Sequence, residues 1–381
     1  MLLQYYLYYI YYTFIGFPFV IRVAVISILI SAIFFFIAFF RLVSSGNGYR
    51  KKKQLKEKFS NQYLDKITQI LSAKDNFSHK FIETMLNCDV KKMTDKEKRV
   101  MTNRILYILD KVENLNQSNY NKLLDYFDLR NFWEKKLKYG NMSSKQRALR
   151  KLDNLNIEIP ASVISAFTYN RDPYLRKMAR YYYMHFSKNN PYKFLDEDFD
   201  KTFNNWDRIE LHRIFALREK EGLPNFTPWV KKSNNSLFKC FLIDEIKFFK
   251  QKESAPSLVE MLNCDDIQIK KHCIEALGEL NYTEAEDLLC CNYALQPLVI
   301  QKSILGTIQK FSTGNALPFL RNAFENTHND EMKILIVQVI YNYGNTGIHT
   351  FNSMKNNMDE NFLKKIFDHV SNPLIKPYAY A

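Results

Sequence analysis

Residues 255–280 read APSLVEMLNCDDIQIKKHCIEALGEL, and their pattern predicts how much of the chain folds. Its second half carries four apolar residues at positions i, i+4, i+8 and i+11, which are Ile269, Cys273, Leu277 and Leu280. Residues at this spacing lie on one side of an α-helix. The first half opens with Ala-Pro and has Leu258 and Leu262 four positions apart, which predicts a preceding helix. The stretch therefore predicts two helices in succession, each with one apolar side.

The apolar pattern of the second helix recurs along the chain at a step of 31 or 32 residues. The other copies read Leu175-Ala179-Tyr183-Phe186, Trp206-Glu210-Ile214-Leu217, Phe238-Leu242-Ile246-Phe249, Ile300-Ile304-Ile308-Phe311 and Met332-Ile336-Ile340-Tyr343. Only Glu210 departs from the apolar rule. A fixed period of this length indicates one structural unit that is copied and stacked.

The residues ahead of each copy repeat as well. Leu258, Leu289 and Leu320 are 31 residues apart, and so are Leu262, Tyr293 and Phe324. Two helices of about ten residues each, with short turns, fill such a period. Neither helix can bury its apolar side alone, so we expect neighbouring units to stack.

At this point the chain resembles the HEAT-repeat superfamily in its short bacterial form. Residues 255–280 show the family's Ala-Pro opening, an Asp before the second helix, Lys residues inside it, and Ala-Leu-Gly near its end. The resemblance covers roughly residues 160–350, and Ser144-Ala148-Leu152-Leu155 could be a degenerate seventh copy. It implies an all-α fold, a right-handed α-solenoid of six to seven helix pairs that binds proteins, but no particular activity. Tetratricopeptide repeats, of about 34 residues, are the nearest alternative.

The N-terminal segment has a different composition. Positions 1–21 and 23–40 contain no charged residue. A helix from Phe19 to Phe40 would be about 33 Å long, enough to cross a hydrocarbon core of about 30 Å. Arg22 lies near one end of it, where its side chain can reach the lipid headgroups. We therefore expect a Tyr-rich N-terminal segment, residues 1–43, with one transmembrane helix over residues 19–40. A second pass through residues 1–16 is disfavoured, because that stretch is mostly tyrosine.

A cleaved signal peptide is the alternative for this segment. It requires a basic beginning, a short apolar core and small residues at a cleavage site. The chain has no basic residue before Arg22, and bulky Phe34-Phe35-Phe36 and Phe39-Phe40 stand near the end of the core. These features favour an uncleaved anchor.

The basic residues around the span predict its orientation. Those that flank it are Arg22, Arg41, Arg50, Lys51, Lys52 and Lys53. Since nearly all of them follow the span, the positive-inside rule places residues 41–381 in the cytoplasm and the N-terminus outside. Cys273 belongs to an apolar stripe, so it is expected to be a buried thiol and not half of a disulfide. We expect a single-pass protein of the bacterial inner membrane.

The net charge of +14 is unevenly distributed. Residues 41–60 carry seven basic and one acidic side chain, and residues 91–151 carry sixteen basic and seven acidic side chains. We expect a basic linker over 44–58, a juxtamembrane helical region or N-terminal cap over 59–155, and the repeats with a C-terminal capping helix over 156–381. The linker can contact anionic lipid headgroups, and the second basic stretch could do the same if it lies flat below the bilayer.

A basic column is the sharpest candidate site. One or two positions after the first residue of each apolar stripe stand cations, namely Arg176, Lys177, Arg208, Lys239, Lys270, Lys271, Lys302 and Lys333. In stacked units they would form one row, which could be a groove for an anionic partner. The alternative is that they pair with carboxylates capping the same helices, such as Asp172, Asp265, Asp266 and Asp330, with Asn204, Asn205 and Asn235 in the equivalent turns. We favour the pairing.

Known catalytic and ligand signatures are missing from the sequence. There is no Cys-x-x-Cys pair, no HExxH, no G-x-S-x-G and no phosphate-binding glycine loop. We therefore expect no metal and no cofactor, and we treat Asp196-Glu197-Asp198 as a solvated turn.

The sequence thus predicts a non-catalytic, membrane-anchored scaffold that binds a protein partner at the membrane. Its architecture resembles that of HEAT proteins encoded beside membrane glycosyltransferases for cell-surface polysaccharide. A membrane-associated enzyme or lyase with its site on the concave face is the alternative. Nucleic-acid binding is a weaker third reading, because residues 152–381 carry no net positive charge.

Overall fold

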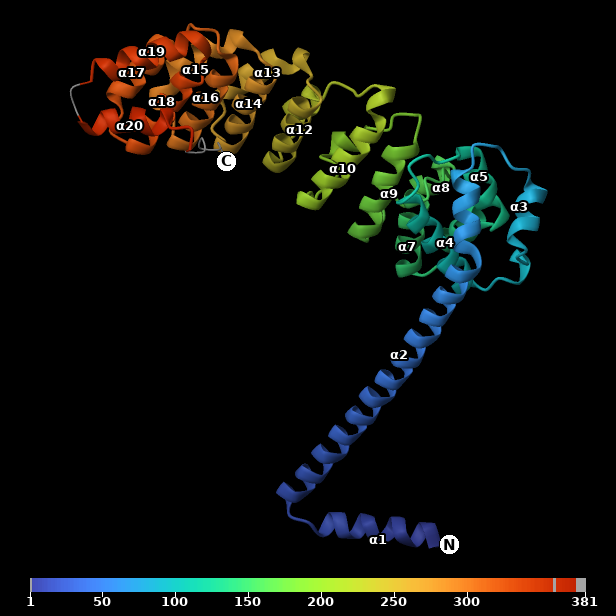
Figure 1. Ribbon diagram of the computed structural model, residues 1–381. Helices are drawn as coiled ribbons and strands as arrows, with labels where there is room; N and C mark the ends of the chain where they lie inside the picture. Colours follow the sequence, from blue (N-terminus) through green and yellow to red (C-terminus); the bar gives the residue numbers. More distant parts are fainter. Residues whose placement is uncertain (1, 359–360, 375–381) are drawn as a thin grey trace. The chain divides into compact units, whose positions relative to one another are not determined.

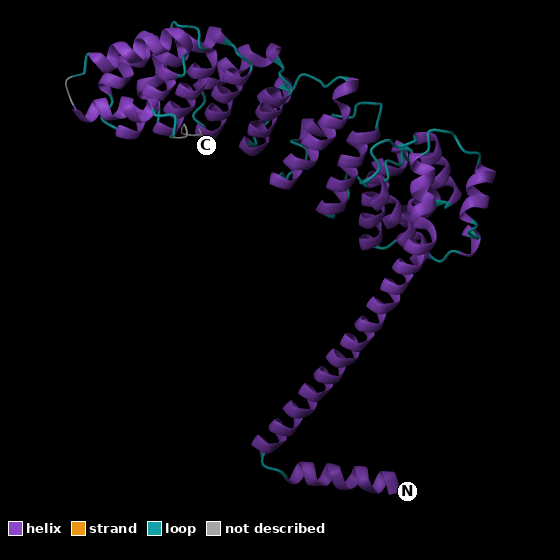
Figure 2. Ribbon diagram, viewed as in Figure 1, coloured by secondary structure: helices purple, strands orange, loops and turns teal. Residues whose placement is uncertain are grey.

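The computed structural model describes residues 2–358 and 361–374, and all regular secondary structure in them is helical (Figures 1 and 2). The predicted all-α fold class is therefore confirmed. The chain divides into two compact units, residues 1–158 and 159–381.

Unit 1 contains the apolar N-terminal segment and a bundle of short helices. Its helices are α1 (Leu2–Gly16), α2 (Phe19–Ser72), α3 (His79–Leu86), α4 (Asp95–Leu109), α5 (Gln117–Tyr126), α6 (Leu129–Tyr139) and α7 (Met142–Asn154). The C-terminal end of α2 packs against α3, α4 and α5, and α6 packs against α7. Buried Asn119 joins two elements, since its Nδ2 donates to the carbonyl oxygens of Ile70, at 3.0 Å, and Asp75, at 2.8 Å.

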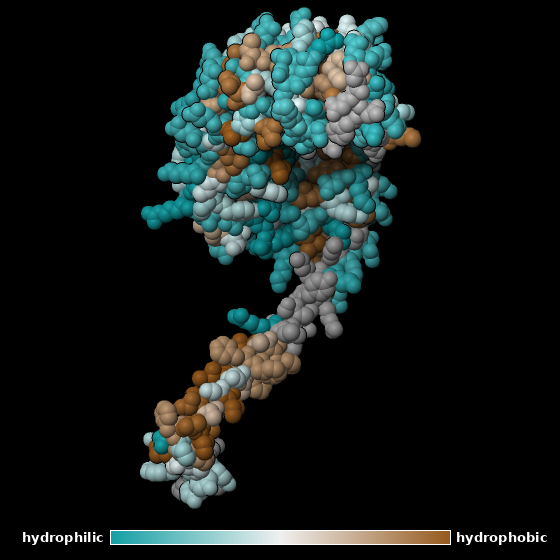
Figure 3. All heavy atoms as spheres, turned by 90° about the vertical axis from the view of Figure 1, so that its left-hand side faces the viewer, coloured by the Kyte–Doolittle hydropathy of each residue, from teal (hydrophilic) through white to brown (hydrophobic). Residues whose placement is uncertain are grey.

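One helix of the described chain is long and apolar enough to cross a membrane. It is the first part of α2, Phe19–Arg41, and none of it is buried in the protein. Figure 3 shows this segment covered by apolar side chains, whereas the remaining surface on that face is mainly hydrophilic. Pro18 precedes α2 and separates it from α1. The Nε of Arg22 donates to the backbone carbonyl of Phe17 at 2.7 Å, so its charge lies at the start of α2.

Residues 44–58, expected to be a basic linker, lie within α2, whose backbone is helical without a break from Phe19 to Ser72. No proline interrupts the stretch, and the Lys, Gln and Glu residues after Gly48 favour a helix enough to offset the two glycines. Of the flanking cations, Arg41 is exposed and Lys53 lies 3.9 Å from Glu57. The side chains of Arg50, Lys51 and Lys52 fall outside the described part of the structure.

Unit 2 contains shorter and longer helices in succession. Its helices are α8 (Ala161–Ser165), α9 (Pro173–Phe186), α10 (Asn205–Arg218), α11 (Thr227–Lys232), α12 (Ser236–Phe248), α13 (Ala255–Glu260), α14 (Ile267–Glu279), α15 (Glu286–Asn292), α16 (Leu298–Phe311), α17 (Leu317–Asn326), α18 (Asp330–Tyr341), α19 (Gly344–Asn356) and α20 (Asn361–Ser371). In each of four pairs a shorter helix packs on the longer helix that follows it: α11 on α12, α13 on α14, α15 on α16, and α17 on α18.

The longer helices also pack on one another in chain order. Helix α14 contacts α12 on one side and α16 on the other, and α18 contacts α16 and α20 (Figure 1). Their apolar stripes face inward: Ile269, Cys273, Leu277 and Leu280 are all buried, and so are the four residues of the stripe of α16. One hydrophobic core runs through the unit from Tyr181 to Phe367.

The predicted stripe of α10 is only partly correct, because Ile214 is buried as predicted whereas both ends of the stripe are exposed. Trp206 is 60% exposed and Leu217 is 53% exposed, so neither belongs to the core. The buried positions at the same spacing are Asp207, Leu211, Phe215 and Arg218. The two polar ends of this stripe have partners on α9 and in the turn after it, because Asp207 binds Lys177 while one guanidinium nitrogen of Arg218 donates to the carbonyls of Met184, His185 and Ser187.

The turns before the longer helices show the period most clearly. The side chains of Asp172, Asn204, Asn235, Asp266 and Asn329 each accept a backbone N–H in the first turn of the helix that follows. Such N-caps stabilise a helix start by about 1 kcal/mol each. The predicted caps Asp172, Asn204, Asn235 and Asp266 are thus confirmed. For α18 the cap is Asn329 and not Asp330, while Asp265 and Asn205 stand next to caps.

Candidate functional site

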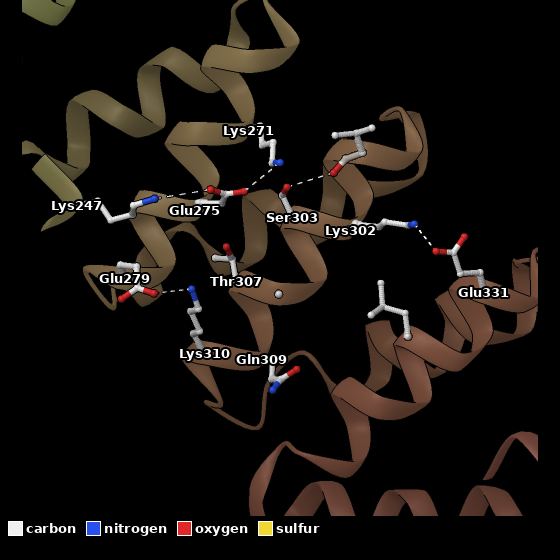
Figure 4. A pocket seen from close by; sticks show the side chains of 13 residues that line it. Lys247, Lys271, Glu275, Glu279, Lys302, Ser303, Thr307, Gln309, Lys310 and Glu331 are labelled. Atoms are coloured by element: carbon white, nitrogen blue, oxygen red, sulfur yellow. Dashed lines mark hydrogen bonds and ion pairs between the residues drawn. The ribbon is translucent and has the colours of Figure 1, made fainter. Parts of the chain in front are cut away.

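A groove of about 740 Å³ crosses the longer helices of unit 2 (Figure 4). It lies over α12, α14, α16 and α18, and charged side chains dominate its lining: Lys247, Lys271, Lys302, Lys310, Glu275, Glu279 and Glu331. Val299 and Leu335 add apolar surface among these charges. With four lysines and three glutamates, the groove offers both signs of charge along its length and has little net charge.

Ion pairs across the groove join neighbouring helices. Lys302 Nζ lies 2.6 Å from Glu331 and Lys310 Nζ lies 2.7 Å from Glu279, each pair bridging two adjacent longer helices. Glu279 also pairs with Lys250 at 3.1 Å. The hydrogen bonds from Lys310 and Lys250 lower the pKa of Glu279 to about 2. These side chains remain partly exposed, so each pair is worth less than about 1 kcal/mol and can exchange its partner for a ligand.

Glu275 connects two lysines at a longer range. Lys247 lies 3.8 Å from it and Lys271 lies 3.7 Å from it. Figure 4 shows that these three side chains follow one another along one edge of the groove. A bound peptide segment whose charges are complementary to these side chains could therefore replace several of the weak internal contacts while the helices stay folded.

The structure separates the predicted basic column into groove and non-groove residues. Lys271 and Lys302 line the groove. Lys270 donates a hydrogen bond to Gln296 at 3.3 Å, and Lys333 lies over the ring of Phe324. The charge of Lys239 stabilises the ionised carboxylate of the capping residue Asp266. Arg208 pairs with Asp244 at 2.9 Å. The cations thus find partners mostly on neighbouring elements rather than in the caps of their own helices.

Arg176 and Lys177 have a structural role. Arg176 donates to both oxygens of buried Asp200, at 2.6 Å and 3.0 Å, and Lys177 lies 2.6 Å from buried Asp207. Although burial opposes its ionisation, the hydrogen bonds from Arg176 and Thr202 hold the pKa of Asp200 at about 2. These two cations, candidates for the basic column, instead bind buried carboxylates; Lys177 is itself buried, whereas the side chain of Arg176 is still 18% exposed.

The charged turn 196–198 also has fixed contacts. Glu197 pairs with Arg180 at 2.9 Å and accepts a hydrogen bond from Tyr169 at 2.8 Å. Asp196 accepts a hydrogen bond from Trp229 at 3.1 Å. Both carboxylates are exposed, as expected of a solvated turn, and side chains of α9 and α11 also contact them.

The sequence pattern did not predict two of the residues that line the groove, Lys247 and Lys310. With Glu279 they occupy the last turn of three successive longer helices and are separated by 32 and 31 residues. These charged residues recur with the same period as the apolar stripes. A search for that period among both basic and acidic residues would therefore have found them.

A second polar cluster lies on α10, α12 and α14. Asp244 binds His272 Nδ1 at 2.8 Å as well as Arg208, and the adjacent Glu245 binds His212 Nδ1 at 3.0 Å. Burial raises the pKa of Glu245 to about 7, whereas the pKa of Asp244 stays below its usual value because, against burial, His272 and Lys247 donate to it. Neither carboxylate lines the groove.

Glu245 is expected to make the stability of the fold depend on pH. Its pKa is higher in the folded protein than the ordinary 4.5, so the folded state holds the proton more tightly and stability falls as pH rises from about 4.5 to about 7. Glu245→Gln removes this loss, and relative to the parent it should gain on the order of 1–3 kcal/mol between pH 5 and pH 8. Urea denaturation at both pH values measures the gain.

Glu279→Gln is the control of opposite sign. The pKa of Glu279 is depressed, so its contribution is present above pH 4.5 and is lost only as pH falls towards about 2. The E279Q variant should therefore show the same change in the free energy of unfolding between pH 5 and pH 8 as the parent protein. An unchanged pH dependence in the E245Q variant would contradict the prediction.

All six cysteines are free thiols, and Cys273 is fully buried, as predicted. In the described part of the chain no three His, Cys, Asp or Glu side chains converge in a way that could hold a metal ion. No model of a known protein family matches this sequence, and no curated protein matches it significantly.

Proposed function

We propose that this protein is a non-catalytic, membrane-anchored scaffold whose unit 2 holds a protein partner at the membrane. The observation that carries the proposal is the groove, which crosses four longer helices and presents four lysines and three glutamates. A partner segment with both charges can exchange the internal ion pairs for intermolecular ones. Such contacts contribute more to specificity than to raw affinity.

Unit 2 is, in this proposal, a HEAT-like right-handed α-solenoid. The support is the chain-order packing of the longer helices together with the capping residues that recur every 31 or 32 residues from Asp172 to Asp266. Stacked helix pairs present an extended surface, which is the usual binding site of such arrays.

The span at Phe19–Arg41 is the proposed anchor. The cationic flank after it favours an orientation with both units in the cytoplasm, at the inner membrane of a bacterium. An anchor raises the effective concentration of a partner in the same membrane, so a weak groove suffices for stable recruitment. A membrane enzyme of cell-surface polysaccharide synthesis is the kind of partner suggested by the sequence resemblance.

The test is affinity purification of the tagged full-length protein from crosslinked membranes, followed by mass spectrometry. We expect one membrane protein to be recovered reproducibly, and a severalfold loss of it when Lys302 and Lys310 are both changed to Glu. The reason is that both reversals act on side chains that line the groove. Failure to recover any reproducible partner, or equal recovery with the double variant, would overturn the proposal.

Two further variants separate binding from stability. Lys231→Glu is the matched control, because Lys231 pairs with Glu260 at 2.8 Å between α11 and α13, outside the groove. It should leave recovery of the partner unchanged. The exchange K302E/E331K restores an internal ion pair with its charges reversed, so the fold is kept while the groove's pattern changes, and recovery should fall.

A further inference from the structure

Helices α6 and α7 form a helical hairpin with an unusual charge. They pack on each other, and residues 129–154 carry eight basic and two acidic side chains. The buried sides of the two helices are apolar, with Phe132, Trp133, Ala148 and Leu149 in the core of unit 1. The cations therefore lie on the outer sides of the hairpin, where Lys135, Arg147 and Arg150 are exposed.

The tip of the hairpin is tight and exposes apolar side chains. Gly140 forms the turn, and a Cβ there would come within 2.3 Å of the Lys136 carbonyl oxygen, so no other residue fits without a shift. Asn141 caps α7 by accepting the N–H of Ser144 at 2.9 Å. The turn leaves two large side chains exposed to solvent, Tyr139 at 84% and Met142 at 44%.

Three cations of α7 lie close to one another. Arg147, Arg150 and Lys151 stand at i, i+3 and i+4, which brings them together on one side of the helix. The pKa of Lys151 is lowered by burial and by repulsion from Arg150 and Arg147. In the part of the chain that the structure describes, no ion pair is found for Lys135 or Arg147. An anionic surface would relieve this repulsion.

We propose that the α6–α7 hairpin docks on an anionic lipid surface, with Tyr139 and Met142 entering the interfacial region and the cations contacting headgroups. Tyrosine favours the membrane interface, and a basic surface around an exposed apolar tip suits peripheral binding to acidic lipids. Lipid is favoured over nucleic acid because the same chain carries the candidate span, and residues 42–58 alone separate the span from Phe59, whose side chain is buried in unit 1. The inference rests on the anchoring part of the proposed function, but not on the partner.

The experiment uses the full chain reconstituted in vesicles of phosphatidylcholine alone or with one third phosphatidylglycerol. Tyr139→Trp places a fluorescent ring at the tip, and lipids brominated on their acyl chains quench it on contact. The signal of the three native tryptophans, measured in the parent protein, is subtracted. We expect severalfold stronger quenching in the vesicles with phosphatidylglycerol, and loss of this excess on adding K135E/R147E or high salt.

Leu295→Trp is the matched control, because Leu295 is 86% exposed and stands in unit 2 in an uncharged stretch. It should show little quenching in either vesicle. Quenching of the Y139W variant no stronger than that of the L295W variant, or equal in both lipids, would overturn the proposal. So would a response of the Y139W variant to duplex DNA in place of lipid.

Alkaline carbonate extraction of the same vesicles tests the anchor separately. A protein that resists extraction but shows no lipid-dependent quenching refutes the hairpin and leaves the anchored scaffold standing. Extraction of the whole protein by carbonate would refute the anchor, and the inference with it.

Discussion

Replacing Asp207 by alanine is expected to lower the free energy of unfolding by about 3–5 kcal/mol. The carboxylate is buried and accepts three hydrogen bonds, from Lys177 at 2.6 Å, from the hydroxyl of Tyr181, and from the backbone N–H of Asn204 at 2.8 Å. Its removal leaves the buried ammonium of Lys177 without its counter-charge. Urea denaturation of the full chain in detergent, followed by circular dichroism, measures the loss.

Two variants identify the cause of that loss. In D207A/K177M no buried charge remains unpaired, so a large part of the stability should return. Glu210→Ala on the same helix breaks the pair with Arg213, at 3.0 Å between partly exposed side chains, and should cost less than about 1 kcal/mol. A D207A variant as stable as the E210A variant would show that the buried network contributes little.

Leu211→Ala is expected to cost about 2–5 kcal/mol, whereas Leu217→Ala on the same helix should change stability by less than about 0.5 kcal/mol. Leu211 is fully buried between α10 and its neighbours, and truncating it leaves a cavity. Leu217 is mostly exposed, although the periodic apolar pattern assigns it to the core.

The comparison is controlled chemically, because both changes remove the same atoms from the same helix. The same denaturation experiment ranks the two variants. Equal costs, or a larger cost for Leu217→Ala, would mean that α10 packs in the register suggested by its sequence pattern and not in the one observed.

Much of the helical architecture could be predicted from the sequence. The stripe Ile269-Cys273-Leu277-Leu280 is buried as predicted, and the capping residues Asp172, Asn204, Asn235 and Asp266 stand where the period placed them. These features depend on local chemistry: which side of a helix is apolar, and which side chain can accept the first free N–H groups. The candidate span follows in the same way from composition and length.

The candidate site was predicted only in part. Lys271 and Lys302 line the groove as the basic column suggested, but Arg176 and Lys177 are bound to the buried carboxylates of Asp200 and Asp207. All four cations stand one or two positions after the first residue of an apolar stripe, so the sequence pattern could not distinguish the groove residues from the others. The distinction depends on whether the next unit supplies a buried carboxylate, which is a contact between side chains about 30 residues apart.

Local chemistry along the chain therefore predicts the period, the helix starts, the apolar sides of most longer helices and the segment able to cross a membrane. Packing between helices is what places Asp207 and Arg218 at core positions of α10 and brings Lys310 to Glu279 across the groove. The physical reason is that a polar residue is stable in a core only when a partner on another element satisfies it. A pattern along one helix records hydrophobicity, but it does not record which neighbour supplies that partner.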